Sequence, residues 1–136
     1  MLVFGGLPCH DGVAYSLDLT EMNWSIIDNI QFIRNGHSAN LIANSVYLFG
    51  GYYIDYYNDI HKYDLEKQTL EEVKTTGNIP SKRGRHGSAV INQNLYIFGG
   101  STGIYDDHDH TLYSLNTNSS EWVAIPITTD SFPSPR

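Results

Sequence analysis

The chain has a single cysteine, Cys9, among its 136 residues, so no disulfide can form within it. A reducing compartment is the default for such a composition, and we expect a cytoplasmic protein. No apolar run approaches the roughly 20 residues that a membrane-spanning helix requires. The N-terminus also lacks a basic segment followed by an apolar core, so we expect neither a secretion signal nor a membrane partner.

Basic residues are scarce as well. The chain has eight Lys and Arg residues and fifteen Asp and Glu residues, which gives a net charge of −7. The eight basic residues are scattered along the chain. Nucleic acids and anionic membranes are bound by clustered positive charge. We therefore expect no nucleic-acid partner.

Helical patterning is missing too, because no segment repeats apolar residues at helical spacing over three turns. No glycine-rich loop stands between a strand and a helix, as a phosphate-binding loop requires. No set of Ser, His and Asp stands out as a nucleophilic triad. These absences argue against most common enzyme classes.

What the chain does contain is an apolar, strand-like run that ends in Phe-Gly-Gly and occurs three times. The three copies end at Gly6, Gly51 and Gly100, so they are 45 and 49 residues apart. A period of this size indicates a repeat architecture. A repeat module cannot bury its own apolar face and must stack on its neighbours.

Further positions recur with the same period. A large apolar residue follows six residues after an Asp or Asn in all three copies, and an Arg-X-X-His lies upstream of the second and third Phe-Gly-Gly. In both of these copies 12 residues separate the histidine from the phenylalanine. The recurring residues are Asp18, Asp64 and Asn116, then Trp24, Leu70 and Trp122, then Arg34 with His37 and Arg83 with His86.

Each full repeat is predicted to form four short strands, A to D, because runs of Val, Ile, Tyr and Trp alternate with Asn, Gly, Ser and Asp. Four antiparallel strands recurring in this way describe a propeller blade, so we predict an all-β fold. Trp24 and Trp122 are expected to lie on outer strands where blades press together. The predicted division is 1–29 (a blade lacking strand A), 30–78 and 79–128 (complete blades), and 129–136 (the start of a further repeat).

On these residues the chain resembles the kelch repeat family, and the resemblance covers nearly its whole length. It departs from the family pattern mildly, with Leu70 in a tryptophan position and Asn116 in an aspartate position. The resemblance implies a kelch-type β-propeller that binds other proteins. The matching residues are Arg34, His37, Phe49-Gly50-Gly51, Tyr63-Asp64, Leu70, Arg83, His86, Phe98-Gly99-Gly100, Asn116 and Trp122.

About 2.75 blades cannot close a ring, because a closed propeller takes four to eight. The chain would expose two apolar blade faces and an unpaired inner strand edge. We therefore expect a fragment whose partners include the rest of its own propeller. Assembly of several chains into a ring and a non-functional gene remnant are the alternatives.

Loop lengths indicate which face of the disc carries recognition. The A-to-B and C-to-D spacings are constant, while the B-to-C intervals are 12, 13 and 16 residues and the D-to-A intervals are 10, 13 and 14. In an antiparallel blade both variable connections lie on one face. Variable loops on a rigid scaffold usually carry recognition.

The variable loops are aromatic or acidic, and we expect their residues to contact a partner protein. Four tyrosines fall within six positions of the second B-to-C loop, and tyrosine gives large contact area at low entropic cost. Alternatively, some of these rings pack inward or extend strand C. The predicted contacts are Tyr52, Tyr53, Asp55, Tyr56, Tyr105 and His108, followed by Arg34 and Arg83, whose other interpretation is a structural bond to backbone carbonyls.

The alternative function is a metal-assisted enzyme or specifier on the same blades, since kelch-like propellers include a copper oxidase and iron-dependent specifiers. His108 and His110 would lie on one side of an extended segment and could bind a divalent ion with a third ligand from elsewhere. No Tyr, Cys and His constellation and no Glu-X-X-X-Asp-X-X-X-His run is present. We therefore expect no enzyme activity, no metal and no cofactor.

Overall fold

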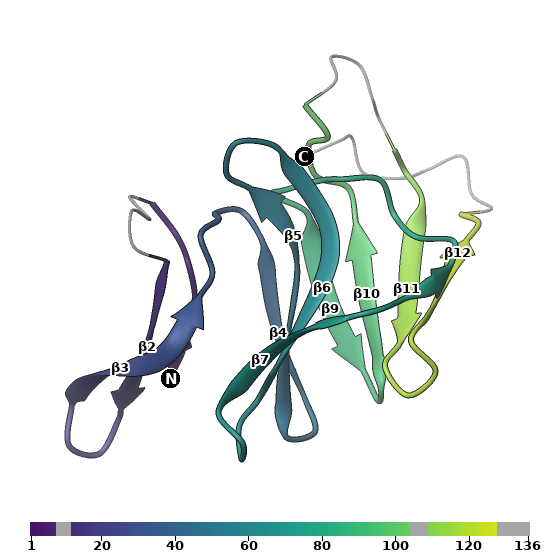
Figure 1. Ribbon diagram of the computed structural model, residues 1–136. Helices are drawn as coiled ribbons and strands as arrows, with labels where there is room; N and C mark the ends of the chain where they lie inside the picture. Colours follow the sequence, from purple (N-terminus) through teal and green to yellow (C-terminus); the bar gives the residue numbers. More distant parts are fainter. Residues whose placement is uncertain (8–11, 104–108, 128–136) are drawn as a thin grey trace.

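The computed structural model describes residues 1–7, 12–103 and 109–127, which form three β-sheets that follow one another in chain order and are antiparallel except for one pair of strands (Figure 1). The first sheet has the order β1-β2-β3, the second β4-β5-β6-β7, and the third β8-β12-β11-β10-β9. The strands are β1 (Leu2–Val3), β2 (Val13–Asp18), β3 (Asn23–Gln31), β4 (Ser38–Ile42), β5 (Ser45–Tyr52), β6 (Tyr56–Asp64), β7 (Thr69–Val73), β8 (Thr76–Gly77), β9 (Gly87–Ile91), β10 (Asn94–Phe98), β11 (Leu112–Asn116) and β12 (Glu121–Ile125).

The predicted all-β fold is confirmed, and β4 to β7 and β9 to β12 each supply the four successive strands predicted for a full repeat. Strands β4 to β7 of the second sheet and β9 to β12 of the third sheet pair antiparallel in chain order. The three sheets remain open at both ends of the row (Figure 1), as expected for part of a propeller. In the described part of the chain, no helix is long and apolar enough to cross a membrane.

A short fifth strand links the second sheet to the third. β8 pairs in parallel with β12, where Thr76 is the partner of Glu121 and Gly77 the partner of Trp122. The chain therefore crosses to the outer edge of the third sheet before it returns to β9 (Figure 1). The sequence division assigned Thr76 and Gly77 to the 30–78 repeat, whereas their hydrogen bonds are with the third sheet.

The constant interval of six residues has a structural cause in the C-to-D turns. Asp64 Oδ1 accepts hydrogen bonds from the backbone N–H groups of Glu66 and Lys67, both at 3.0 Å. Asp18 and Asn116 do the same two and three residues downstream. Near the end of each turn one residue has a positive φ, at Met22, Gln68 and Ser120. The side-chain oxygen thus closes each turn locally, which either Asp or Asn can do.

Two hydrophobic cores lie between the sheets, and β5 contributes to both of them. Val46 and Leu48 belong to the core against the first sheet, while Tyr47 and Phe49 belong to the core against the third. Successive side chains of a strand point to opposite faces, so the central sheet is buried on both sides. This is why β5 has a continuous apolar run instead of an alternating pattern.

In each core an aromatic ring packs on the phenylalanine of the Phe-Gly-Gly in the preceding sheet. The ring comes from the third strand of the blade in one core and from the fourth strand in the other. Tyr63 of β6 packs edge-on against Phe4 with a centroid distance of 5.3 Å. Trp122 of β12 packs against Phe49 at the same distance. Tyr63 pairs across strands with Leu70, and Leu115 occupies the corresponding place opposite Trp122. The mild departure at Leu70 is therefore offset by a tyrosine on the neighbouring strand.

The expectation that both tryptophans lie between blades is correct for Trp122 and wrong for Trp24. Trp122 is 1% exposed, whereas Trp24 is 55% exposed and Ile26 is 61% exposed. Trp24 occupies the place in β3 that Trp122 occupies in β12, but no sheet of the described residues packs against its face of the first sheet. The burial of this tryptophan position depends on a preceding sheet.

Candidate functional site

The long connections meet at one end of the sheets, and backbone hydrogen bonds join them there. Asn35 and Tyr52 exchange N–H···O=C bonds of 2.9 and 2.8 Å, as do Gly84 and Ser101. Arg85 N–H donates to Gly36 O at 2.7 Å. Each connection that enters a sheet is thus tied to the start of the B-to-C connection of that sheet. We call this end the loop face, formed by residues 32–37, 52–56, 78–86 and 99–103.

The double glycines make this close approach possible. Gly50 has φ of +63°, and a Cβ built on it would lie 2.6 Å from Arg83 O. Gly51 N–H donates to that same Arg83 carbonyl at 2.8 Å. Any other residue would both strain the backbone and collide with the neighbouring connection. The Phe-Gly-Gly repeat therefore fixes where the loop face begins.

The tip of the β5–β6 hairpin is the most exposed apolar part of the loop face. Tyr52 is 40% exposed, Tyr53 is 44% exposed and Ile54 is 81% exposed. The ring of Tyr52 lies 5.0 Å from that of Tyr56. These three side chains form an exposed aromatic and apolar surface at the tip of the hairpin, where Tyr52 pairs with Tyr56.

The other residues of this hairpin make contacts within the protein. Tyr56 OH lies 3.2 Å from Ser101 Oγ of the next connection. The ring of Tyr57 lies 4.0 Å from the Arg34 guanidinium carbon. Asp55 forms an exposed ion pair of 2.8 Å with Lys82, and this hydrogen bond lowers the pKa of the Asp55 carboxyl. Of the tyrosines in this run, Tyr52 and Tyr53 are the most exposed.

Arg34 is buried within the second sheet. Its guanidinium forms two bonds to the Asp59 carboxylate, at 2.5 and 3.1 Å, and a third to Gly50 O at 3.2 Å. The rings of Phe32 and Tyr57 lie on its faces at 4.6 and 4.0 Å. The N–H groups at the edge of the guanidinium are thus hydrogen-bonded, and aromatic rings pack on its faces.

Arg83 repeats the arrangement in the third sheet and is 1% exposed. It donates to Gly99 O at 2.9 Å, to Ser81 O at 3.1 Å and to Ser81 Oγ at 2.8 Å, and it forms an ion pair with Asp109. Hydrogen bonds from Arg83, Thr111 and Tyr113 lower the pKa of the Asp109 carboxyl to about 2, although burial alone would raise it. Arg34 and Arg83 thus hold the Phe-Gly-Gly backbone, as the structural interpretation of these arginines requires.

The two repeated histidines lie between sheets. The His37 ring is 4.9 Å from Phe32, and the His86 ring is 5.1 Å from Phe49. His86 Nε2 lies 2.9 Å from Ser38 Oγ, which links the third sheet to the second. Burial, reinforced by the nearby Arg34 or Arg83 charge, lowers the pKa of each imidazole to about 4. Both rings are therefore neutral at pH 7.

Two of the predicted contact residues, Tyr105 and His108, lie outside the described residues. Within 1–7, 12–103 and 109–127, no group of three or more His, Cys, Asp and Glu side chains is arranged to hold a metal ion.

The sequence patterns did not reveal a hollow on the loop face. The cavity measures about 340 Å³ and is lined by Asn35, Gly36, Tyr52, Tyr56, Gly84 and Arg85. Only the fold brings together residues from three connections here. The available sequence signal was the alignment of Arg85 with Gly36, since each directly precedes the repeated histidine.

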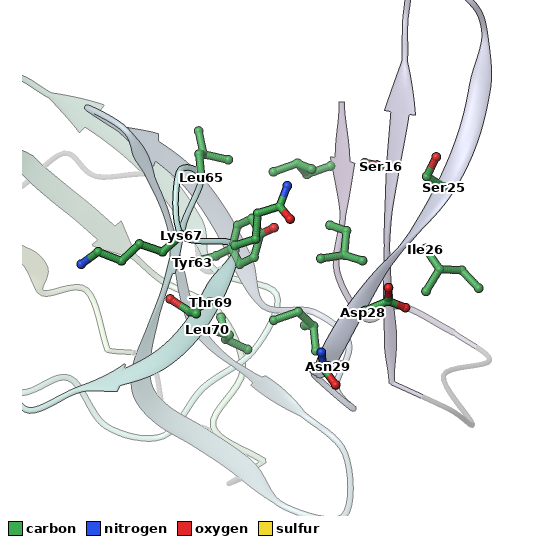
Figure 2. Close-up of a pocket in the computed structure, with 14 residues that line it drawn as sticks. Ser16, Ser25, Ile26, Asp28, Asn29, Tyr63, Leu65, Lys67, Thr69 and Leu70 are labelled. Atoms are coloured by element: carbon green, nitrogen blue, oxygen red, sulfur yellow. The ribbon is translucent and has the colours of Figure 1, made fainter.

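A larger cleft of about 810 Å³ lies between the first and second sheets (Figure 2). Tyr63, Thr69 and Leu70 of the second sheet line one side, and Ser25 and Asn29 of β3 line the other. Leu70 stands here where the third sheet has Trp122. The cleft is thus an underfilled interface between sheets.

Three stacked, like-built antiparallel sheets with connections gathered at one end define this chain as part of a β-propeller. Over residues 1–136 it matches the family model of the KLHDC2/KLHL20/DRC7 Kelch-repeats domain. The chain therefore belongs to the kelch-repeat family, and this membership favours a protein-interaction module.

Three relatives illustrate the range of proteins that carry similar repeats. The chain is 29% identical to Kelch domain-containing protein 3 of Rattus norvegicus over 142 residues, which cover 92% of this chain and 37% of that protein. It is 32% identical to Kelch domain-containing protein 10 of the same species, covering 91% and 34%. It is 34% identical to Acyl-CoA-binding domain-containing protein 5 of Arabidopsis thaliana, covering 77% and 17%. The chain spans little more than a third of these relatives at most.

Proposed function

We propose that this chain is a non-enzymatic protein-binding module whose partner contacts the loop face. The observation that carries the proposal is the exposed apolar tip of the β5–β6 hairpin, Tyr52, Tyr53 and Ile54, on a backbone tied to both neighbouring connections. Asp55 and Tyr56 extend this surface, and we propose that Tyr105 and His108 of the next loop contribute to it. Arg34 and Arg83 contribute by fixing the backbone beneath it.

Affinity purification from cells with matched variants tests this proposal. We expect Tyr52→Ala with Tyr53→Ala to lose the specific partners of the wild-type protein, while the melting temperature stays within a few degrees. Met22→Ala is the control, because Met22 is also exposed but lies in a C-to-D turn at the other end of the sheets. A recovered partner is then titrated as a purified protein, and a Kd that the tyrosine changes leave unaltered contradicts the proposal.

We also propose that further kelch blades complete the propeller. The support is the exposed face of the first sheet, where Trp24 lies at the position that Trp122 fills against Phe49 in the third sheet. A blade supplying a phenylalanine at this place buries Trp24 in the same way. Sedimentation velocity tests the idea, because the 136-residue chain alone should associate through this face. A cooperatively folding monomer at high concentration would refute it.

A metal-assisted activity is the competing function, and calorimetric titration with Cu²⁺, Fe²⁺ and Zn²⁺ separates the two. The binding-module proposal expects no tight metal binding. Tight binding that is lost in a His108→Ala, His110→Ala double variant would overturn it in favour of the metal-assisted alternative.

A further inference from the structure

The outer edge of the third sheet carries a strand that the outer edge of the second sheet lacks. β8 pairs there in parallel with β12. Thr76 N–H donates to Ser120 O at 3.0 Å, one step before this pairing. Asn78 N–H donates to Trp122 O at 2.8 Å, one step after it. Among the described residues, no strand pairs with the outer edge of β7, which is the corresponding strand D of the second sheet.

The edge of β7 is open because the connection that follows β3 stays on its own sheet. Phe32 N–H donates to Gly12 O at 2.8 Å, which turns this connection back towards β2. Its D-to-A interval is also only 10 residues, against 13 for the connection that contains β8. The first connection therefore does not do for β7 what the second does for β12.

The space beside the open edge is hollow. Thr69 and Leu70 of β7 line the cleft of about 810 Å³ between the first and second sheets (Figure 2). A further cavity of about 560 Å³ extends along β7 to Glu72 and shares Asn29 and Leu70 with the cleft. Leu70 is smaller than Trp122, the residue at its place in the third sheet, so this interface has room that the other lacks.

A bulge in β3 shapes the opposite wall of the cleft. The ladder between β2 and β3 skips residues 28–30, whereas β7 and β12 pair with their neighbours without a shift. Asn29, within the bulge, has φ of +60°, a conformation that asparagine tolerates better than most residues. Bulges are frequent beside binding sites because they re-aim side chains. An amide at this wall can hydrogen-bond to a peptide backbone.

From this juxtaposition we propose that an extended segment of a partner protein enters the cleft and pairs in parallel with β7, as β8 pairs with β12. Leu70 corresponds to Trp122 in the repeat. Gln68, like Ser120, has a positive φ at the end of the preceding turn. By this register the carbonyls of Gln68 and Leu70 accept hydrogen bonds from the segment, and one of its apolar side chains fills the space beside Leu70.

The chemistry of the site favours a polypeptide as the occupant. Only an extended polypeptide offers N–H groups at the spacing of a strand, and an added strand gains affinity from main-chain bonds and specificity from its side chains. The cleft shares no residue with the loop face. This second surface is therefore independent of the function proposed above.

The test selects twelve-residue peptides by phage display on the wild-type chain and removes those that also bind Leu70→Trp, in which the larger ring fills the cleft. We expect peptides whose affinity for Leu70→Trp is at least tenfold weaker. N-methylation removes one backbone donor at a time. Along the paired part of a synthetic peptide, it should weaken binding about tenfold at alternate positions and change it little at those between.

Two further variants separate recognition from folding. Asn29→Gly should weaken peptide binding about fivefold and leave the melting temperature unchanged, because glycine accepts this φ. This variant also serves as the test if Leu70→Trp proves to be poorly folded. Tyr52→Ala with Tyr53→Ala alters the loop face alone and should leave the affinity of these peptides unchanged.

Three outcomes would overturn the inference. If no selected peptide distinguishes the wild-type chain from Leu70→Trp and Asn29→Gly, the cleft is not a binding site. If binding depends on the cleft but not on peptide N–H groups, the proposed strand pairing is wrong. If self-association is lost in Leu70→Trp but kept in Trp24→Ser, the occupant is a second copy of this chain. The loop face stands or falls separately, by its own tyrosine variants.

Discussion

At the scale of single residues, His37 and His86 couple folding to pH. Their pKa in the folded protein is about 4, whereas a histidine in an unfolded chain titrates near 6.5. Between these values the unfolded chain binds more protons, so stability rises with pH across this window. Burial is the main cause of the lowered pKa values. The Arg34 charge also opposes protonation of His37, although the Arg34 and Phe4 backbones favour it, and Arg83 and His37 oppose protonation of His86.

We therefore expect the free energy of unfolding to fall by a few kcal/mol as the pH drops from about 7 to 4.5. Urea unfolding followed by tryptophan fluorescence at a series of pH values measures this. His86→Gln should lower stability at pH 7 and flatten the slope. Asp109 cannot produce the same slope, because its lowered pKa acts only below the ordinary aspartate range. A profile that is flat down to pH 4.5 would contradict the assignment.

Arg83 offers a second test at this scale. Arg83→Met should lower the free energy of unfolding by about 3–5 kcal/mol, because it leaves the Asp109 charge and the Gly99 carbonyl without their buried partner. Adding Asp109→Asn should recover part of the loss, and thermal unfolding of the four proteins in this cycle measures the coupling. Lys67→Met is the exposed control, and an equal effect of Lys67→Met and Arg83→Met would contradict the role assigned to Arg83.

At the scale of elements, the C-to-D turns show why Asp and Asn exchange freely. In each turn a side-chain oxygen accepts hydrogen bonds from the backbone N–H groups two and three residues later in the chain. Both Asp and Asn carry such an oxygen. Charge is secondary in this role.

Asn116→Asp should therefore change the free energy of unfolding by less than about 0.5 kcal/mol, while Asn116→Ala should lower it by about 1 kcal/mol. Chemical denaturation of both variants checks this. The matching pair at Asp64, Asp64→Asn and Asp64→Ala, should behave alike. A large loss in Asn116→Asp would show that something other than the acceptor oxygen matters.

The aromatic exchange between neighbouring strands also belongs to this scale. One ring must cover the phenylalanine of the preceding sheet, and it comes from β6 at Tyr63 or from β12 at Trp122. Because Leu70 lines the cleft of about 810 Å³ between the first and second sheets, that interface has room for a larger side chain.

Tyr63→Leu should lower the free energy of unfolding by about 2 kcal/mol or more, since it removes the ring on Phe4. Adding Leu70→Trp should restore most of the loss, because the pair then becomes the Leu and Trp combination of the third sheet. Thermal unfolding of the single and double variants measures this rescue. If Leu70→Trp is equally favourable with and without Tyr63, the two positions do not exchange roles.

At the scale of the whole molecule, the two tryptophans separate folding from association. Trp122→Ala should unfold or strongly destabilise the chain, by about 3–5 kcal/mol, because the ring is fully enclosed in the core between the second and third sheets. Trp24→Ser should change the unfolding free energy by less than about 0.5 kcal/mol and should reduce self-association in sedimentation experiments. Equal destabilisation by both changes would contradict the model of an uncovered first sheet.

The blade plan was predictable because it depends on local rules that recur with the repeat. Alternating apolar residues, turn-forming Asp and Asn, and Phe-Gly-Gly located the strands and the turns of each blade. The buried state of Trp24 was not predictable in the same way, because its motif is the same as that of Trp122 and only the presence of a neighbouring sheet differs. The same limit applies to Arg34 and Arg83, since no spacing rule pairs them with Asp59 and Asp109.

The sequence by itself determined the period, the order of strands A to D within each blade and the end at which the variable loops gather, since these follow from side-chain alternation and chain connectivity. The tertiary structure alone decided which rings fill the space between sheets. It also decided that Tyr52 and Tyr53 are more open to solvent than Tyr56, and that Arg85 and Tyr52 line one hollow. Those outcomes depend on contacts between residues far apart in the chain, and a local pattern carries no information about which distant surface will cover it.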